Sequence, residues 1–98
     1  MVKIYHRRYP DTQWDYKAVS TEVGNKEIIY DTLSDHGKKS QGVEIYSGRN
    51  YDVGSNERSY SRKYKLSEVP KIYKKTVAML KRVHKKTKWS KEKEVDYN

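Results

Sequence analysis

The chain has 98 residues, with 22 lysines and arginines against 13 acidic residues, which gives a formal net charge of +9 at pH 7. It contains no cysteine, which excludes disulfides, iron–sulfur clusters and thiolate zinc sites. No apolar run approaches the ~18 residues that a membrane span needs, and the first residues lack the apolar core of a secretory signal. We therefore expect a cytoplasmic protein that does not enter the membrane.

Tyrosine compensates for a low content of aliphatic side chains. The sequence has ten tyrosines and two tryptophans but no phenylalanine. These rings can bury apolar area while their polar tips stay hydrated or hydrogen-bonded. We expect one folded domain over residues 1–88 and a frayed tail over residues 89–98, with Trp89 folding back onto the body.

Alternating apolar and polar side chains predict β-strands in the first two thirds of the chain. Turn-forming residues separate these runs. The predicted strands are residues 2–9, 14–19, 43–46 and 58–66, and the predicted turns and loops are residues 10–11, 24–25, 36–40 and 48–57. The last strand has no plainly apolar face, so we expect it at an edge of the sheet.

Residues 25–36 fit two structures. Ile28 and Tyr30 favour a strand that pairs back across the preceding turn. Leu33, followed by Gly37, instead suits a short helix. We prefer the strand and keep the helix as the alternative.

Residues 68–87 are predicted to form one long amphipathic helix, because its apolar side chains fall on one side at about 100° per residue. The predicted apolar side comprises Val69, Ile72, Tyr73, Thr76, Val77, Met79, Leu80 and Val83. Ser67 is the expected N-cap, with Glu68 near the positive end of the helix and Pro70 in its first turn. The sequence thus predicts an α+β fold, an antiparallel sheet of four to five strands followed by one C-terminal helix.

The opposite side of this helix is almost purely cationic. Its cations are Lys71, Lys74, Lys75, Lys81, Arg82, Lys85, Lys86 and Lys88, and Glu68 is the one acid between residues 67 and 88. Lysines at one- and two-turn spacing can follow a phosphate backbone and release counterions. A surface that serves solubility alone usually mixes both signs, which this one does not. Because lysine outnumbers arginine, the pattern favours phosphate contact over base recognition.

The predicted strand over residues 58–66 supplies four further binding candidates. They interleave basic and aromatic side chains and are Arg58, Tyr60, Arg62 and Tyr64. Such a surface can stack bases and hold phosphates. Alternatively, the two tyrosines pack beneath the helix, and the sequence leaves both interpretations open.

Catalytic and metal sites find little support in the sequence. His6, His36 and His84 are far apart and lack metal-ligand spacing. His36 suits a turn better than a general base beside Asp35 or Asp31, and His84 falls at the boundary of the apolar helix face. We predict no catalytic residue, no metal and no cofactor.

Three functions remain, in order of preference. The first is a small basic, non-enzymatic protein that binds DNA, RNA or a nucleoprotein complex through the lysine-rich helix face. The second is an inhibitor that docks on an acidic host protein such as a CRISPR effector, because in size, lack of cysteine and lysine and tyrosine content the chain is similar to accessory proteins of phages and mobile elements. The third is a small ribonuclease toxin that needs no metal. The sequence does not indicate an oligomeric state.

Overall fold

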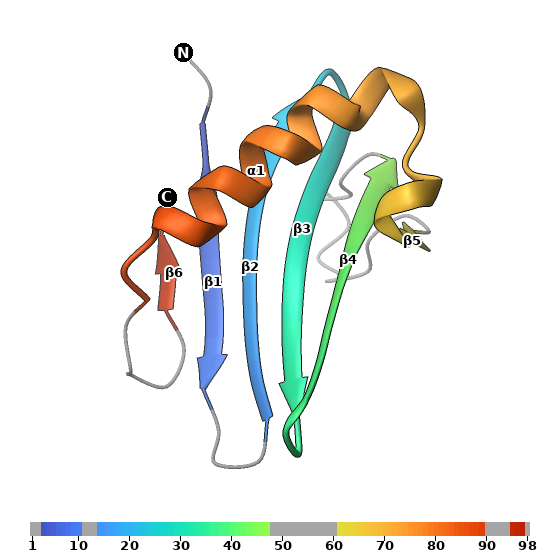
Figure 1. The fold of residues 1–98 in the computed structure, drawn as a ribbon. Helices are drawn as coiled ribbons and strands as arrows, with labels where there is room; N and C mark the ends of the chain where they lie inside the picture. Colours follow the sequence, from blue (N-terminus) through green and yellow to red (C-terminus); the bar gives the residue numbers. More distant parts are fainter. Residues whose placement is uncertain (1–2, 11–13, 48–60, 90–94, 98) are drawn as a thin grey trace, which may run out of the picture.

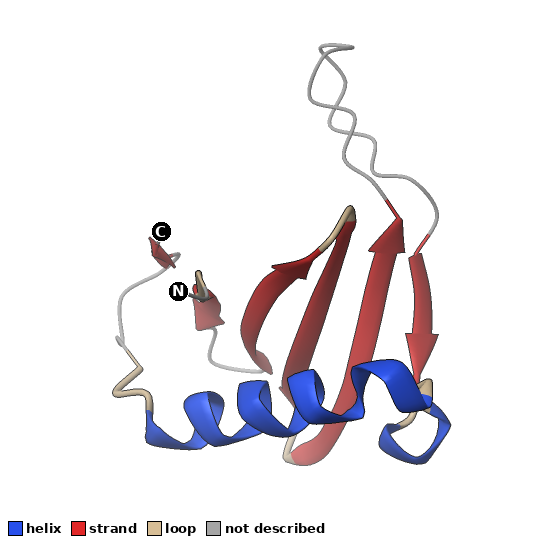
Figure 2. Ribbon diagram, turned by 90° about the horizontal axis from the view of Figure 1, so that it is seen from above, coloured by secondary structure: helices blue, strands red, loops and turns tan. Residues whose placement is uncertain are grey.

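The computed structural model of the chain describes residues 3–10, 14–47, 61–89 and 95–97. They form an antiparallel sheet with one α-helix across one of its faces (Figures 1 and 2), which confirms the predicted α+β fold. The strands are β1 (Tyr5–Pro10), β2 (Trp14–Val23), β3 (Lys26–Asp35), β4 (Lys38–Ser47), β5 (Ser61–Tyr64) and β6 (Val95–Tyr97), in the spatial order β5-β4-β3-β2-β1-β6. The α-helix, α1, comprises Lys74–Lys86. The strand predicted at an edge, β5, does lie at an edge of the sheet.

The central part of the sheet is built from two long hairpins. β2 pairs with β3 over the full ten residues of each strand, and β3 pairs with β4 over the same length. Residues 25–36 therefore contribute a strand, and the helical alternative is wrong. The polar loop predicted over residues 36–40 is also wrong, because His36 and Gly37 alone make the turn. Both have positive φ, +49° and +84°, as the tight turns that match strand twist require.

The core lies between α1 and the face of the sheet that it covers. Alternate residues of the central strands point to this face, because successive side chains of a strand point to opposite sides. The buried core residues are Val19, Ile28, Tyr30, Val43, Ile45, Val69, Val77 and Leu80. Leu80, from the middle of α1, is fully buried and anchors the helix to the sheet.

The α-helix begins later than predicted. Single 3₁₀ turns at Leu66–Glu68 and Lys71–Tyr73 precede it, and Val69 between them is extended (φ −61°, ψ 130°). The physical reason is Pro70, because a residue before proline is disfavoured from the helical region. The predicted N-cap at residue 67 is therefore wrong for α1, which starts at Lys74.

One predicted apolar position is wrong as a consequence. Ile72 lies in the second 3₁₀ turn and is 78% exposed. A 3₁₀ turn advances by three residues rather than 3.6, so the side that faces the sheet in α1 is not continued through residues 71–73. The other residues predicted on the apolar side are buried or partly buried.

The tail after α1 returns to the body of the protein. Trp89 packs against the core, and its Nε1 donates a hydrogen bond to the carbonyl oxygen of His84 at 3.1 Å. Within the segment expected to be frayed, residues 95–97 form β6, which pairs with β1 at the edge of the sheet. Figure 1 shows β6 beside β1 below the C-terminal end of α1.

Candidate polyanion-binding surface

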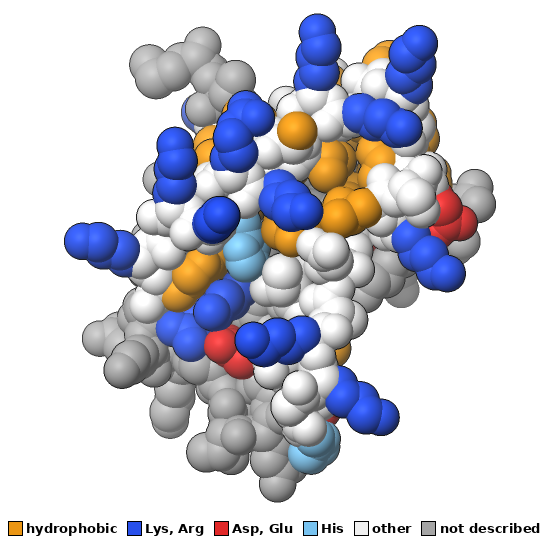
Figure 3. Space-filling model, in the orientation of Figure 1, with side chains coloured by type: hydrophobic (Ala, Val, Ile, Leu, Met, Phe, Trp, Pro, Cys, Tyr) orange, Lys and Arg blue, Asp and Glu red, His pale blue; other side chains and the backbone are white. Residues whose placement is uncertain are grey.

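The structure brings the eight predicted helix cations together as one surface, here called the cationic ridge. Its members are Lys71, Lys74, Lys75, Lys81, Arg82, Lys85, Lys86 and Lys88. All eight residues are exposed. In Figure 3, lysine and arginine side chains project along the outer side of α1, over a band of apolar side chains.

The ridge is not neutralised by carboxylates of the described residues. The ion pairs described there join Arg8 and Lys17 to Asp15 and His36 to Asp35. No member of the ridge has an ion pair with any residue that the structure describes. Glu68, the one acid of the segment, accepts a hydrogen bond from the backbone N–H of Lys65 at 2.9 Å. The positive charge is therefore available to an external anion.

The first turn of α1 carries cations where a helix favours anions. Lys74 and Lys75 lie at its N-terminal end, and no acidic residue occurs in that turn. The helix dipole makes this end positive, so each cation there costs roughly 0.3–1 kcal/mol. Departures of this kind from what stability favours are typical of functional surfaces.

The cations of α1 itself form two rows along the helix. At about 100° per residue, Lys74, Lys81 and Lys85 share one row, and a second row follows beside it. Lys81 precedes His84 by three residues, so the two lie on the same side of the helix. His84 reaches Thr32 of β3, and the first row therefore borders the part of the sheet next to α1 that the helix leaves open.

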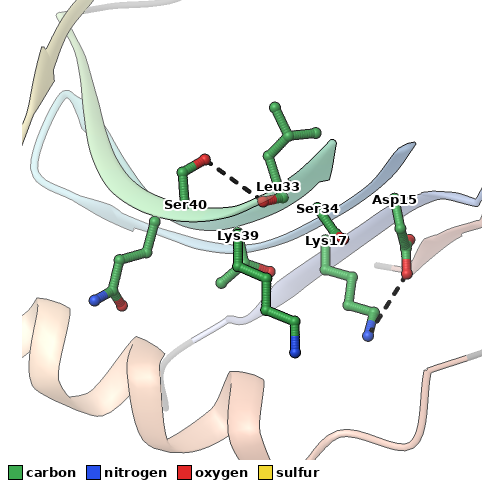
Figure 4. A pocket seen from close by; sticks show the side chains of 8 residues that line it. Asp15, Lys17, Leu33, Ser34, Lys39 and Ser40 are labelled. Carbon is green, nitrogen blue, oxygen red and sulfur yellow. Dashed lines mark hydrogen bonds and ion pairs between the residues drawn. The ribbon is translucent and has the colours of Figure 1, made fainter. Parts of the chain in front are cut away.

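This open part of the sheet forms a hollow, here called the sheet groove, of about 370 Å³. Its lining residues are Asp15, Lys17, Thr32, Leu33, Ser34, Lys39, Ser40 and Gln41. Figure 4 shows the side chains of Lys17 and Lys39 pointing toward the helix side of the sheet, whereas those of Leu33 and Ser40 point to the other side. The groove therefore adds two lysines to the surface that the ridge begins.

His84 lies between the ridge and the sheet. Its Nε2 is 3.0 Å from the hydroxyl oxygen of Thr32, and its ring meets those of Tyr30 and Trp89 at centroid distances of 5.2 and 5.0 Å. Burial lowers the pKa of His84, and the charges of Lys17 and His6 lower it further, while a hydrogen bond to the backbone of Lys17 acts against them. The predicted boundary position of His84 is confirmed.

His6 of β1 has a similar structural role at the end of the helix. The hydroxyl of Thr87 donates to the carbonyl oxygen of Val83 at 2.7 Å, so it accepts a hydrogen bond from Nε2 of His6 at 3.1 Å. The ring of His6 also meets the edge of Trp89 at 5.7 Å, and burial lowers the pKa of His6. These contacts fix the C-terminal end of α1 to the sheet.

The candidates predicted on residues 58–66 do not join this surface in the described structure. Tyr64 is partly buried and packs against the core, as in the packing interpretation of that strand. Arg58 and Tyr60 lie outside the described residues, as does the side chain of Arg62. His36 lies at the exposed tip of the β3–β4 hairpin, where its Nδ1 is 2.8 Å from Asp35, so it is a turn residue.

Sequence reasoning missed the two lysines of the sheet groove. Lys17 and Lys39 are distant in the sequence and belong to different strands. The signal lies in the register, because Lys17 pairs with Thr32 while Lys39 pairs with Ser34, two residues further along β3. Only a correct alignment of three strands reveals that these lysines share one face.

A comparison of the chain with family models, curated proteins and solved structures finds no match. Within the described ranges, no helix is long and apolar enough to cross a membrane. The same residues contain no cluster of three or more histidines and carboxylates that could hold a metal ion.

Proposed function

We propose that this protein binds nucleic acid through the cationic ridge, as a non-enzymatic binding protein. The observation that supports this most directly is the exposure of all eight ridge cations, none of which has an ion pair among the described residues. Partnered surface lysines would have little to offer an external anion, whereas these retain their full charge.

The shape of the ridge suits a phosphate backbone. The thirteen residues of α1 extend over about 20 Å at 1.5 Å per residue, and cations recur along this length in two parallel rows. Seven of the eight are lysines, which act as point charges rather than as the bidentate forks that recognise guanine. The proposed binding is therefore electrostatic and independent of sequence.

The test compares two triple variants that change the net charge equally. Lys81, Lys85 and Lys86 are replaced by glutamine in the ridge variant. The control variant replaces Lys3, Lys38 and Lys65, which are exposed but outside the ridge. Binding to a labelled oligonucleotide is measured by fluorescence anisotropy over a series of salt concentrations, and circular dichroism verifies that both variants fold.

We expect the ridge variant to lose affinity by on the order of tenfold, because each lost phosphate contact lowers the salt slope by about 0.9 on duplex. The control variant should lose much less. Equal losses in the two variants, or binding by the wild type that does not respond to salt, would contradict the proposal.

The same material distinguishes the two other functions. An inhibitor of a nucleic-acid enzyme would retain a protein partner from host lysate after nuclease treatment, while its binding to free oligonucleotides stayed weak. A ribonuclease would shorten an RNA probe during incubation, and replacement of His36 or Arg62 by alanine would stop it. Recovery of the intact probe in a tight complex supports binding alone.

A further inference from the structure

The helix covers only part of the sheet face on which it packs. Val19, Tyr30 and Val43 form one row across the strands beneath the helix. The next row, which includes Lys17 and Gln41, belongs to the sheet groove. Figure 1 shows β2, β3 and β4 continuing well past α1 on this side.

Cations stand on both sides of the sheet groove. Lys17 and Lys39 rise from the sheet, and the helix row that contains Lys81 and Lys85 borders the groove opposite them. In Figure 3, blue side chains lie both along α1 and on the sheet beyond it. An anion in the groove would therefore be attracted from two directions.

The one carboxylate that lines the groove is already compensated. Arg8 donates two hydrogen bonds to Asp15, from Nε to Oδ1 at 3.2 Å and from Nη2 to Oδ2 at 3.0 Å. The Nζ of Lys17 is a further 3.7 Å from the same carboxylate. Lys39, in contrast, has no ion pair within the described residues. The groove thus keeps a positive charge that the protein does not balance.

The remaining polar groups of the groove are suited to donate hydrogen bonds. The hydroxyl of Tyr30 donates to Oε1 of Gln41 at 2.7 Å, which leaves the NH₂ group of Gln41 as a donor on the groove lining. The hydroxyl of Ser34 adds another donor. Amines, amide N–H groups and hydroxyls are the partners that phosphate oxygens accept from.

The size of the groove selects the form of nucleic acid. A space of about 370 Å³ admits a nucleotide of an extended strand, whereas the double helix is too wide to enter it. We propose that the sheet groove holds the sugar–phosphate backbone of single-stranded nucleic acid, so that ridge and groove together bind single strands more tightly than duplex. This inference rests on the proposed function and adds the form of the ligand. No aromatic side chain lines the groove, so its contacts carry no base preference.

The experiment measures a short oligothymidylate and a duplex of the same length with the wild type and with Lys17→Gln/Lys39→Gln. We expect the wild type to prefer the single strand. The double variant should lose on the order of tenfold in affinity for it, with a salt slope lower by about 0.7 for each lost contact. Its affinity for duplex should change much less.

Adjacent residues of β4 provide a matched control. Lys38 and Lys39 are both exposed but point to opposite faces of the sheet. Lys39→Gln should weaken single-strand binding, and Lys38→Gln, with the same change of charge, should not. Both lie at the exposed start of the strand, so neither replacement disturbs the core.

Three outcomes would overturn the assignment of the groove while leaving the ridge intact. They are equal affinity of the wild type for both ligands, equal losses on both ligands in the double variant, and equal effects of the Lys38 and Lys39 replacements. A wild type that binds neither ligand would overturn the proposed function itself, and the groove with it.

Discussion

The two partly buried histidines are structural groups that secure the helix below its charged surface. His84 contacts β3 through Thr32 and Tyr30, and its carbonyl oxygen holds Trp89. His6 binds Thr87 immediately after the helix. An imidazole in such surroundings is more stable when neutral, because burial removes water from the charged form.

We predict that acid destabilises the fold through His6 and His84. Burial lowers both pKa values below the ordinary 6.5, so the unfolded chain binds more protons than the folded protein as the pH falls through that value. The free energy of unfolding is then highest above about pH 6.5 and declines as the pH falls from there toward the lowered pKa values. Urea denaturation at a series of pH values measures this decline.

His84→Gln should flatten that decline, because it removes one of the two groups that titrate. Its glutamine can still hydrogen-bond to Thr32, so the folded state is preserved at neutral pH. His36→Gln removes an exposed histidine from the hairpin tip and is the matched control. A pH profile of His84→Gln parallel to that of the wild type would show that His84 does not contribute.

At the level of whole elements, the sequence predicted those parts of the fold that α1 covers. Apolar alternation is clear at Ile28 and Tyr30 and again at Val43 and Ile45, and all four are buried. The first residues of β4, from Lys38 on, lie beyond the helix and are exposed. They need no apolar side chains there, so periodicity gives no sign of a strand.

The candidate site divides in the same way. The ridge was predictable because one helix carries all of it and helical spacing is local. The sheet groove was not, because Lys17 and Lys39 come together only through the register of three strands. The start of α1 was missed because Pro70 was placed in the first turn of the helix, whereas the restriction that it imposes on Val69 interrupts it.

For α1, we predict that stability and binding respond differently to charge reversal at its two ends. Lys74→Glu places an acid at the positive end of the helix and should raise the free energy of unfolding by roughly 0.3–1 kcal/mol or more. Lys85→Glu places an acid at the negative end and should lower it by a similar amount. Both changes remove the same charge from the same row, so both should weaken oligonucleotide binding.

Urea denaturation and anisotropy on the same two proteins measure these effects. High salt provides the control, because screening should reduce both changes in stability. If Lys74→Glu destabilised the protein, the cations of the first turn would be serving the fold. The cost to stability that we attribute to function would then not exist.

Across the whole molecule, the two faces of the sheet differ in charge. The face opposite α1 holds the buried carboxylates Asp31 and Glu27. Tyr16 donates to Asp31 at 3.2 Å, and burial followed by the charge of Asp31 raises the pKa of Tyr16. With cations over one face and acids on the other, the field of the protein turns the ridge and the groove toward an approaching polyanion.

This asymmetry predicts a one-sided footprint. When the protein is acetylated with and without single-stranded oligonucleotide, Lys39, Lys74 and Lys85 should be protected, since they lie on the helix side and a bound phosphate shields each amine. Lys38 points to the opposite face and should react equally in both samples. Because Lys38 and Lys39 are adjacent, equally exposed in class and chemically identical, their difference isolates the direction in which each points. Mass spectrometry of the digested protein gives each modification separately. Protection of Lys38 to the same degree as Lys39 would mean that the oligonucleotide coats both faces, and the charge asymmetry would then have no part in orienting it.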